Sequence, residues 1–342
     1  MKILFVHCRR GLYQLTKCRD CGHIFECGNC DAKLVTYRQL NRGLELICHQ
    51  CQTYYRYPNK CPSCGSDQLY SKYGGIEELV EILERETKLK PTRLDRTGKI
   101  HSSRHLDSQS KKNIFILDRQ DKNALVSGNI INEIEDNDEL FVHTRLYDPS
   151  VVYTEFDRIV FVQAENLLSS ADYLVAEEII KSLSEVISQV NETTQLVFDT
   201  NSPELEIFQD LVKVHFEHTE NISLSQWYLS FLEKEKSNRL KFGFPPFKNL
   251  LLVTTQEKSA SISLDKLKIV GNYLNSIKSG FPDITWSSPY PAKFLKRRNL
   301  YSHHILIRYP NGYKSFSSLR REIAKLRDLY NLQVRLNPRH LF

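Results

Sequence analysis

Eight cysteines near the amino terminus form four Cys-x-x-Cys pairs: Cys18 and Cys21, Cys27 and Cys30, Cys48 and Cys51, and Cys61 and Cys64. A two-residue spacer lets one tight turn present both sulfurs to one metal ion, and four thiolates complete a tetrahedral zinc site. The eight cysteines therefore predict two structural Zn²⁺ ions. A disulfide framework is the alternative, and it requires an oxidising compartment.

Four pairs can form two sites in three ways. The segment between the second and third pairs has a length suited to a β-ribbon that folds these two pairs onto one ion, which leaves the outer pairs to share the other. Sequential and cross-braced pairings stay open from the sequence. His23 and His49 lie within the segment, but eight cysteines already supply all the ligands. The ninth cysteine, Cys8, is predicted to be a small buried residue.

The length and composition indicate a globular chain. With 342 residues and 41% apolar content, the chain can bury a sizeable core and has room for two to three domains. No apolar stretch approaches the length of a membrane-spanning helix, and the apolar run at the amino terminus is too short for a signal peptide. Because zinc ligands need reduced thiols, we expect a cytoplasmic protein that does not bind membranes.

The net charge of +6 is unevenly placed along the chain. Residues 1–72 hold 11 Lys and Arg against 5 Asp and Glu, and residues 289–342 hold 12 against 2. The segment between them is acidic. Basic ends flanking an acidic centre are typical of a protein that holds a polyanion, so nucleic acid is the expected partner. The alternative is that the basic ends only solvate the protein or dock on its acidic middle.

Short apolar runs alternate with segments of helical spacing in the first two thirds of the chain. The runs predict parallel strands that are covered on both faces, at Lys2–Val6, Thr92–Asp95, Ile114–Asp118, Leu140–His143, Ile159–Val162 and Leu196–Asp199. Helices are predicted after Gly75 and over Ala171–Val190. This alternation predicts an α/β domain with a mostly parallel sheet, into which the cysteine segment is inserted after the first strand.

A smaller α+β unit follows a charged helix that begins near Leu224. Within it, a basic segment predicted to be a loop interleaves cations with aromatic rings. Cations grip phosphates and rings stack on unpaired bases, which is the combination that single-stranded nucleic acid needs. The predicted phosphate contacts are Lys293, Lys296, Arg297, Arg298, Arg308, Arg320 and Arg321. The predicted stacking rings are Tyr290, Phe294 and Tyr301, and the alternative is that each ring belongs to the core.

Several motifs together resemble the PriA family of replication restart helicases. Arg9-Arg10-Gly11 precedes the four cysteine pairs, Gly74-Gly75-Ile76-Glu77 follows them, and further matches are Arg93-Leu94-Asp95-Arg96, Arg239–Phe247 and Pro289–Arg308. The resemblance covers nearly the whole chain but only the C-terminal part of the family. It implies a RecA-like second helicase lobe (1–14 and 73–223), an inserted zinc module (15–72) and a C-terminal DNA-binding domain (224–342).

The chain departs from the family where ATP chemistry is concerned. It has no Gly-x-x-x-x-Gly-Lys-[Ser/Thr] loop and no Asp-Glu-x-His motif, which in the family lie in the first helicase lobe. The family's Gly-Thr-Gln motif is His143-Thr144-Arg145 here. Its arginine-finger motif maps on Glu185–Glu192, which contains no arginine. An arginine finger accelerates phosphoryl transfer by a factor on the order of 10³–10⁵. We expect no autonomous helicase activity.

The resulting prediction is a PriA-like primosomal protein for replication restart. It binds single-stranded or forked DNA through its basic C-terminal and zinc modules, without its own ATPase. Primosome and single-strand-binding proteins are further expected partners. One alternative is the C-terminal half of a split ATP-dependent DNA helicase that acts with a separate N-terminal lobe. Another is a zinc-ribbon scaffold for protein or RNA.

Overall fold

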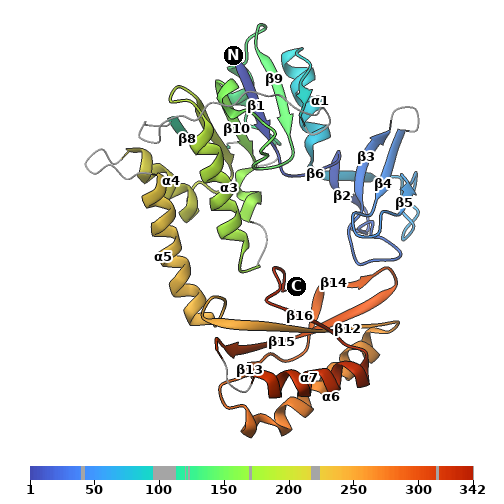
Figure 1. The fold of residues 1–342 in the computed structure, drawn as a ribbon. Coiled ribbons are helices and arrows are strands. Elements are labelled where there is room, and N and C mark those ends of the chain that lie inside the picture. The colour runs from blue at the N-terminus through green and yellow to red at the C-terminus, as the bar shows by residue number, and fades with distance from the viewer. Residues whose placement is uncertain are drawn as a thin grey trace.

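Three parts make up the chain (Figure 1): a lobe built on a parallel sheet, a small β module inserted into this lobe, and a C-terminal domain beyond a long helix. The inserted part is called the metal module below. The computed structural model describes residues 1–39, 43–94, 113–119, 121, 124–168, 172–216, 224–312 and 316–341.

The lobe contains a six-stranded parallel sheet with the order β7-β9-β1-β10-β11-β8. Its strands are β1 Lys2–Val6, β7 Thr92–Arg93, β8 Asn113–Asp118, β9 Glu139–His143, β10 Arg158–Val162 and β11 Gln195–Thr200. The predicted parallel sheet is thus confirmed. Asp95 and Arg96 of the predicted arginine/aspartate motif lie outside the described residues.

Helices cover both faces of this sheet. They are α1 Ile76–Thr87, α2 Gly128–Asn132, α3 Val175–Gln189, α4 Glu206–Phe216 and α5 Leu224–Phe242, with short 3-10 helices η1 Tyr153–Glu155 and η2 Ala164–Leu168. Because strand side chains alternate between faces, Ile3 and Phe5 of β1 pack with α1 and α2, whereas Leu4 and Val6 pack with α3 and α4. Burial on both faces explains why the strands have continuous apolar sequences.

Helix α5 joins the lobe to the C-terminal domain. Its Trp227 is only 2% exposed and belongs to the lobe's core together with residues of α3 and α4. Arg239, nearer the end of α5, forms an ion pair with Glu177 of α3. The predicted domain boundary at 224 therefore differs from the structure, in which the chain leaves the lobe after α5, near Gly243.

The metal module is a five-stranded antiparallel sheet with the order β5-β4-β3-β2-β6. Its strands are β2 Tyr13–Cys18, β3 Val35–Gln39, β4 Gly43–Ile47, β5 Tyr54–Arg56 and β6 Leu69–Gly74. The chain enters the module on β2 and leaves it on β6, and these two strands pair along their length.

The C-terminal domain packs two helices on one face of an antiparallel sheet. Its elements are β12 Lys248–Glu257, α6 Ala260–Ser276, η3 Lys278–Gly280, β13 Thr285–Trp286, β14 Tyr290–Arg297, β15 Leu300–Pro310, α7 Phe316–Tyr330 and β16 Gln333–Leu336. Val253 and Ile305 face α6 and α7, while Leu252 and Leu306 face the lobe, where they meet Tyr173. None of the described helices is long and apolar enough to cross a membrane.

Candidate metal centres and nucleic-acid surface

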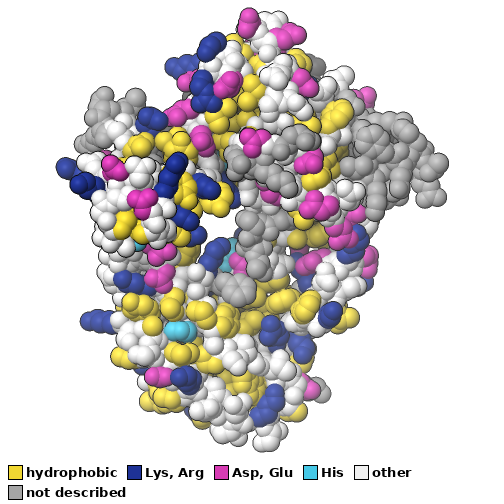
Figure 2. Space-filling model, turned by 180° about the vertical axis from the view of Figure 1, so that it is seen from behind, with side chains coloured by type: hydrophobic (Ala, Val, Ile, Leu, Met, Phe, Trp, Pro, Cys, Tyr) yellow, Lys and Arg dark blue, Asp and Glu magenta, His cyan; other side chains and the backbone are white. Residues whose placement is uncertain are grey.

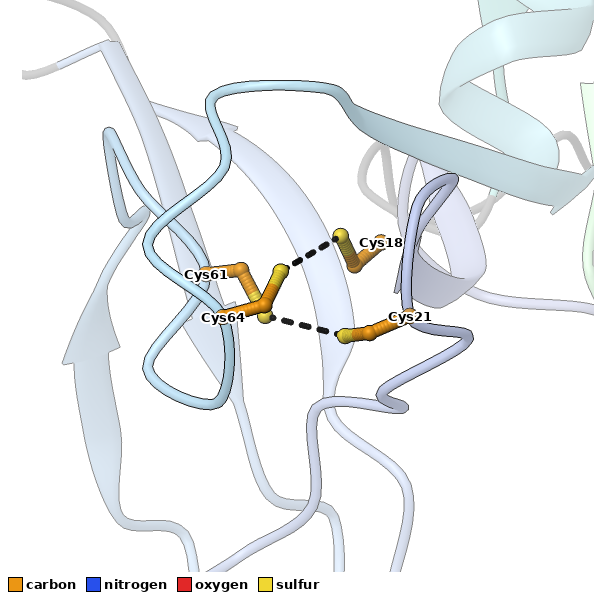
Figure 3. A group of neighbouring side chains, drawn as sticks. All are labelled: Cys18, Cys21, Cys61 and Cys64. Atoms are coloured by element: carbon orange, nitrogen blue, oxygen red, sulfur yellow. Dashed lines mark hydrogen bonds between the residues drawn. The ribbon is translucent and has the colours of Figure 1, made fainter.

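The eight predicted ligands gather into two groups of four cysteines, and within each group all sulfur atoms lie within 4.8 Å of one another. Cluster I consists of Cys18, Cys21, Cys61 and Cys64 (Figure 3). Cluster II consists of Cys27, Cys30, Cys48 and Cys51. The nested pairing predicted from the spacing is thereby confirmed, since the outer pairs form one cluster and the inner pairs form the other.

The sulfur–sulfur distances fit tetrahedral metal coordination. In cluster I, the Sγ atoms of Cys18 and Cys64 are 3.7 Å apart, and those of Cys21 and Cys61 are 3.6 Å apart (Figure 3). In cluster II, Cys27 and Cys51 are separated by 3.5 Å. Four thiolates about 2.3 Å from Zn²⁺ would place neighbouring sulfurs about 3.8 Å apart, whereas a disulfide requires about 2.05 Å. All nine cysteines are free, so the donor sets fit metal ions and not disulfides.

Backbone amides support the sulfurs in both clusters. The amide of Asn29 donates to Cys27 Sγ at 3.4 Å, and the amide of Ser63 donates to Cys61 Sγ at the same distance. These bonds from the second residue of each spacer stabilise negative charge on the sulfur. In cluster II the hydroxyl of Tyr55 also lies 3.2 Å from Cys27 Sγ. The two histidines in the segment are not members of either cluster.

The module has little apolar core besides the cysteines. Phe25, Ala32, Leu34 and Leu46 are the buried apolar side chains that pack with cluster II. A core of this size stabilises a fold weakly, so bound metal would supply much of the folding free energy.

Two glycines allow the module to meet the lobe closely. Gly11 has φ +81°, and a Cβ there would lie 2.6 Å from Val35. A Cβ on Gly75 would lie 2.1 Å from the carbonyl oxygen of Gly11. The Gly75 amide donates to the Leu12 carbonyl at 2.8 Å, and the Ile76 amide, which begins α1, donates to the Arg9 carbonyl at 2.9 Å. Close backbone contact therefore explains the second glycine of the pair after the cysteines, Gly75.

The predicted basic loop is instead a β-hairpin, which corrects the sequence analysis. Strands β14 and β15 pair up to Arg297 and Leu300, and the two-residue turn between them has φ 51° at Arg298 and 62° at Asn299. Positive φ at both turn positions is the type I′ geometry that suits tight hairpins. Lys293, Arg297 and Arg298 are exposed, whereas the Lys296 ammonium donates to the carbonyl of Gly28 in the metal module at 2.7 Å.

All three predicted stacking rings are half-buried, and two of them pack against apolar cores of the protein. Phe294 contacts the core around cluster II. The Tyr290 ring packs with Leu250 and Leu252, and its hydroxyl donates to the Leu341 carbonyl at 2.9 Å. Tyr301 is half-buried on β15. Packing alone is therefore a sufficient reason for an aromatic residue at Phe294 and at Tyr290, and stacking on a base is not needed to account for either ring.

The remaining predicted cations do not join the hairpin in one surface. Arg308 is half-buried, its guanidinium lies 5.5 Å from the Phe244 ring centroid, and burial lowers its pKa. Arg320 and Arg321 are exposed on α7, on the side of the C-terminal sheet that faces away from the lobe. The predicted phosphate contacts therefore lie in at least two separate places.

The metal module was predicted to take part in DNA binding, but the residues that form its basic surface were not singled out. On β6, Tyr70 lies under two cations, since Arg19 Cζ is 5.4 Å and Lys72 Nζ 5.5 Å from its ring centroid. Lys17 pairs with Tyr70 across β2 and β6, which places both on one face. Within the described part of the chain, no carboxylate forms an ion pair with these three cations. The signal in the sequence was the alternation of Lys17 with Arg19 and of Tyr70 with Lys72 along paired strands.

Buried charges occupy the carboxyl edge of the lobe's sheet, the edge where open α/β sheets bind ligands. The Arg119 guanidinium follows β8 and donates to Asp199 of β11 at 3.2 Å and to Glu165 at 2.8 Å. The side chain of Arg119 is 1% exposed and that of Asp199 is fully buried. Burial raises the pKa of Asp199 to about 6, against the opposing effect of Arg119.

The His143-Thr144-Arg145 motif lies at the same edge. Asp148 forms ion pairs with His143 Nε2 at 3.4 Å and with Arg145 at 3.0 Å, and Arg145 is 63% exposed. A small cavity of about 100 Å³ lies at the ends of β1 and β10, between His7 and Asn166. Cys8, which also lines it, is exposed, so the prediction that it is buried was wrong.

Comparison with known proteins finds no matching family model, but it finds similar curated proteins. The chain is 25% identical over 327 residues to the replication restart protein PriA of Synechocystis, a match that covers 93% of this chain and 35% of that protein. It is 24% identical over 310 residues to PriA of Thermotoga maritima, covering 90% of this chain and 36% of the relative.

A third relative extends the match to nearly the full chain. PriA of Haemophilus influenzae is 23% identical over 341 residues, which cover 98% of this chain and 41% of that protein. The resemblance to PriA inferred from the motifs is thereby confirmed, together with its partial extent, because the chain spans 35–41% of the length of these relatives.

Proposed function

We propose, from similarity to PriA replication restart proteins over at least nine tenths of the chain, that this protein acts in restarting DNA replication. In this proposal it binds single-stranded or forked DNA, and clusters I and II each hold one structural Zn²⁺. Primosome and single-strand-binding proteins would be its protein partners. Because its cysteines must stay reduced to bind zinc, the cytoplasm is its expected location.

The zinc ions would act on structure and not on chemistry. Each cluster uses four cysteine ligands, which leaves no open position for water or substrate. The residues around them hold the sulfurs in place through backbone amides. The metal module would therefore serve as a rigid platform that displays basic and aromatic side chains.

The observation that best supports DNA binding is the surface formed by Lys17, Arg19, Tyr70 and Lys72, called the β6 surface here. It combines cations with an aromatic ring, as single strands require, and no ion pair joins its cations to a carboxylate among the described residues. The exposed hairpin cations Lys293, Arg297 and Arg298 would extend the contact along the phosphate backbone.

Fluorescence anisotropy with labelled single-stranded, forked and duplex DNA tests this proposal. Changing Lys17, Arg19 and Lys72 together to Gln should weaken binding and lower the slope of log affinity against log salt by about 2, since each contact to a single strand contributes about 0.7. A matched control is to change Lys268 and Lys325 to Gln, because both already pair with neighbouring carboxylates. An unchanged slope in the triple variant would remove the β6 surface from the DNA site.

The ring is tested separately. Tyr70→Leu keeps apolar bulk but loses the stacking surface, so it should weaken single-strand binding by about 1–3 kcal/mol without changing the salt slope. Tyr70→Phe is the control and should bind normally. Equal affinity for RNA and DNA, or none for either, would favour the scaffold alternative.

In this proposal, the isolated chain does not hydrolyse ATP. It rests on the absence of arginine from the finger segment Glu185–Glu192 and on the missing phosphate loop and metal-binding acids. The buried Arg119–Asp199 pair at the carboxyl edge agrees with it, because these charges neutralise each other. Calorimetric titration with Mg-ATP should show no binding. Micromolar binding would instead favour the C-terminal half of a split helicase.

A further inference from the structure

The metal module and the C-terminal domain touch at cluster II. The segment Cys27–Asp31, called the knuckle here, contains two ligands of cluster II and lies against the turn of the β14–β15 hairpin. These two segments are more than 260 residues apart in the sequence. Neither the cysteine pattern nor the basic segment indicates that they meet.

Backbone groups carry most of this contact. The Asp31 amide donates to the Lys296 carbonyl at 3.0 Å, and the Lys296 amide donates to Asp31 Oδ2 at 2.8 Å. The Asn299 amide donates to the Asn29 carbonyl at 2.8 Å, and the side-chain amide of Asn299 lies 3.3 Å from Asn29 Oδ1. The Lys296 ammonium also donates to the Gly28 carbonyl. The hairpin thus binds backbone groups of the knuckle, whose positions depend on the conformation of this segment.

One contact reaches a metal ligand directly. The Arg298 amide donates to Cys30 Sγ at 3.3 Å. Such outer partners stabilise the negative charge of a ligating thiolate and fix its orientation. Phe294 adds apolar contact with the core around cluster II. The hairpin therefore completes the surroundings of cluster II.

Cluster I has no comparable contact. Among the described residues, no hydrogen bond joins its segments Cys18–Gly22 and Cys61–Gly65 to the C-terminal domain. The amides there bond within the module, for example Arg19 to the Gln68 carbonyl at 2.8 Å. The two clusters thus differ in what surrounds them, although their ligand sets are identical.

The contact also closes a ring of domains. The lobe is linked through α5 to the C-terminal domain and through β2 and β6 to the metal module, and the knuckle and hairpin join the far ends (Figure 1). Figure 2, seen from behind, shows an opening between the three parts, with Lys and Arg side chains gathered on the side of the metal module.

We propose that the knuckle is a binding site for the β14–β15 turn, and that metal in cluster II, but not in cluster I, holds the C-terminal domain on the metal module. Metal bound by Cys27 and Cys30 fixes the backbone between them, so its loss would release the groups that the hairpin binds. By linkage, docking must strengthen metal binding by the same factor. The inference rests on the proposed metal binding and is independent of DNA binding.

Hydrogen exchange of the zinc-loaded chain of 342 residues tests the first half of this proposal. In Cys51→Ser, exchange of the Lys296, Arg298 and Asn299 amides should accelerate at least tenfold, while in Cys64→Ser it should stay as in the unaltered protein. Equal acceleration in both variants, or none in Cys51→Ser, would overturn the proposal.

A variant that keeps all eight cysteines tests the reciprocal half. Asp31→Ala should still hold two zinc ions but should release one of them to a chelator about tenfold faster, because loss of outer partners commonly lowers metal affinity 10–100-fold. Asp67→Ala is the matched control, since its carboxylate bonds to neighbouring Gln68 beside cluster I. If Asp31→Ala frees the hairpin amides but leaves both zinc release rates unchanged, the metal and the domain contact are not coupled. Zinc content, measured first, separates this failure from failure of the metal assignment.

Discussion

Replacing Arg119 tests the interpretation of the carboxyl edge most directly. Its guanidinium donates four hydrogen bonds: to Asp199 at 3.2 Å, Glu165 at 2.8 Å, Asn201 at 3.0 Å and the Leu125 carbonyl at 3.4 Å. Arg119→Met keeps most of the apolar stem but leaves the fully buried Asp199 without its cation. Removing one partner of a buried ion pair typically costs about 3–5 kcal/mol, so we expect a loss of this size in the free energy of unfolding.

Urea unfolding followed by tryptophan fluorescence measures this loss. Trp227 lies in the core of the lobe and Trp286 in the C-terminal domain, so a Trp286→Phe background makes the signal specific to the lobe. The control is Arg145→Met, which removes the 63% exposed partner of Asp148. The Asp148 carboxylate keeps two hydrogen bonds from Ser150, so this change should cost less than about 1 kcal/mol. A loss below about 1 kcal/mol for Arg119→Met as well would refute the view that this charge cluster stabilises the lobe.

A second substitution separates charge from packing. Hydrophobic residues often replace a whole buried ion pair without loss. Arg119→Met combined with Asp199→Leu should therefore be more stable than Arg119→Met alone, although Glu165 keeps a partly exposed charge nearby. A double variant as unstable as the sum of both single changes would show that packing, and not the unpaired carboxylate, causes the loss.

Three further predictions concern metal, backbone contact and pH. Purified protein should contain two zinc ions by metal analysis, and Cys27→Ser and Cys61→Ser should each lose about one of them. Chelation should unfold the metal module, as measured by circular dichroism. A single zinc ion per chain would contradict the assignment of two metal clusters. Gly75→Ala should cost more than about 2 kcal/mol because its Cβ would meet the Gly11 carbonyl at 2.1 Å, whereas Gly280→Ala, with open space around it, should be neutral in the same urea assay. Because the pKa of Asp199 is raised to about 6 in the folded state, protonation of this carboxylate favours folding. The resulting gain in the free energy of unfolding is fully present below about pH 4 and is lost as the pH rises through about 6. Asp199→Asn should remove this pH dependence from unfolding curves.

The lobe and the clusters were predictable because local patterns determine them. Continuous apolar runs mark strands that are covered on both faces, and the Cys-x-x-Cys spacing specifies two-sulfur turns. The nested pairing followed from the length of the β3–β4 ribbon between Cys30 and Cys48. In these cases the residues that decide the structure are near one another in the sequence.

Features that depend on distant contacts were not predictable in the same way. Phe294 was interpreted as a stacking ring because its neighbours are basic, yet it packs against cluster II. The boundary at 224 followed a change to charged sequence, but Trp227 anchors that helix in the lobe. Lys72 is a near neighbour of Tyr70 on β6, but Arg19, beyond the end of β2, reaches the Tyr70 ring only because β2 pairs with β6. Only the assembled structure brings such residues together.

The pairing of β2 with β6 also bears on how such a chain could arise. Tyr13 and Gly74 are direct partners in an antiparallel pair, so their Cα atoms are only about 4.5–5.5 Å apart. The segment between them can therefore be gained or lost in evolution while the two cut ends of the lobe stay within reach of a short turn. A shortened gene that joins these ends would encode a lobe with its sheet order intact. The module could then be transplanted as a unit to another host fold that offers two adjacent chain ends.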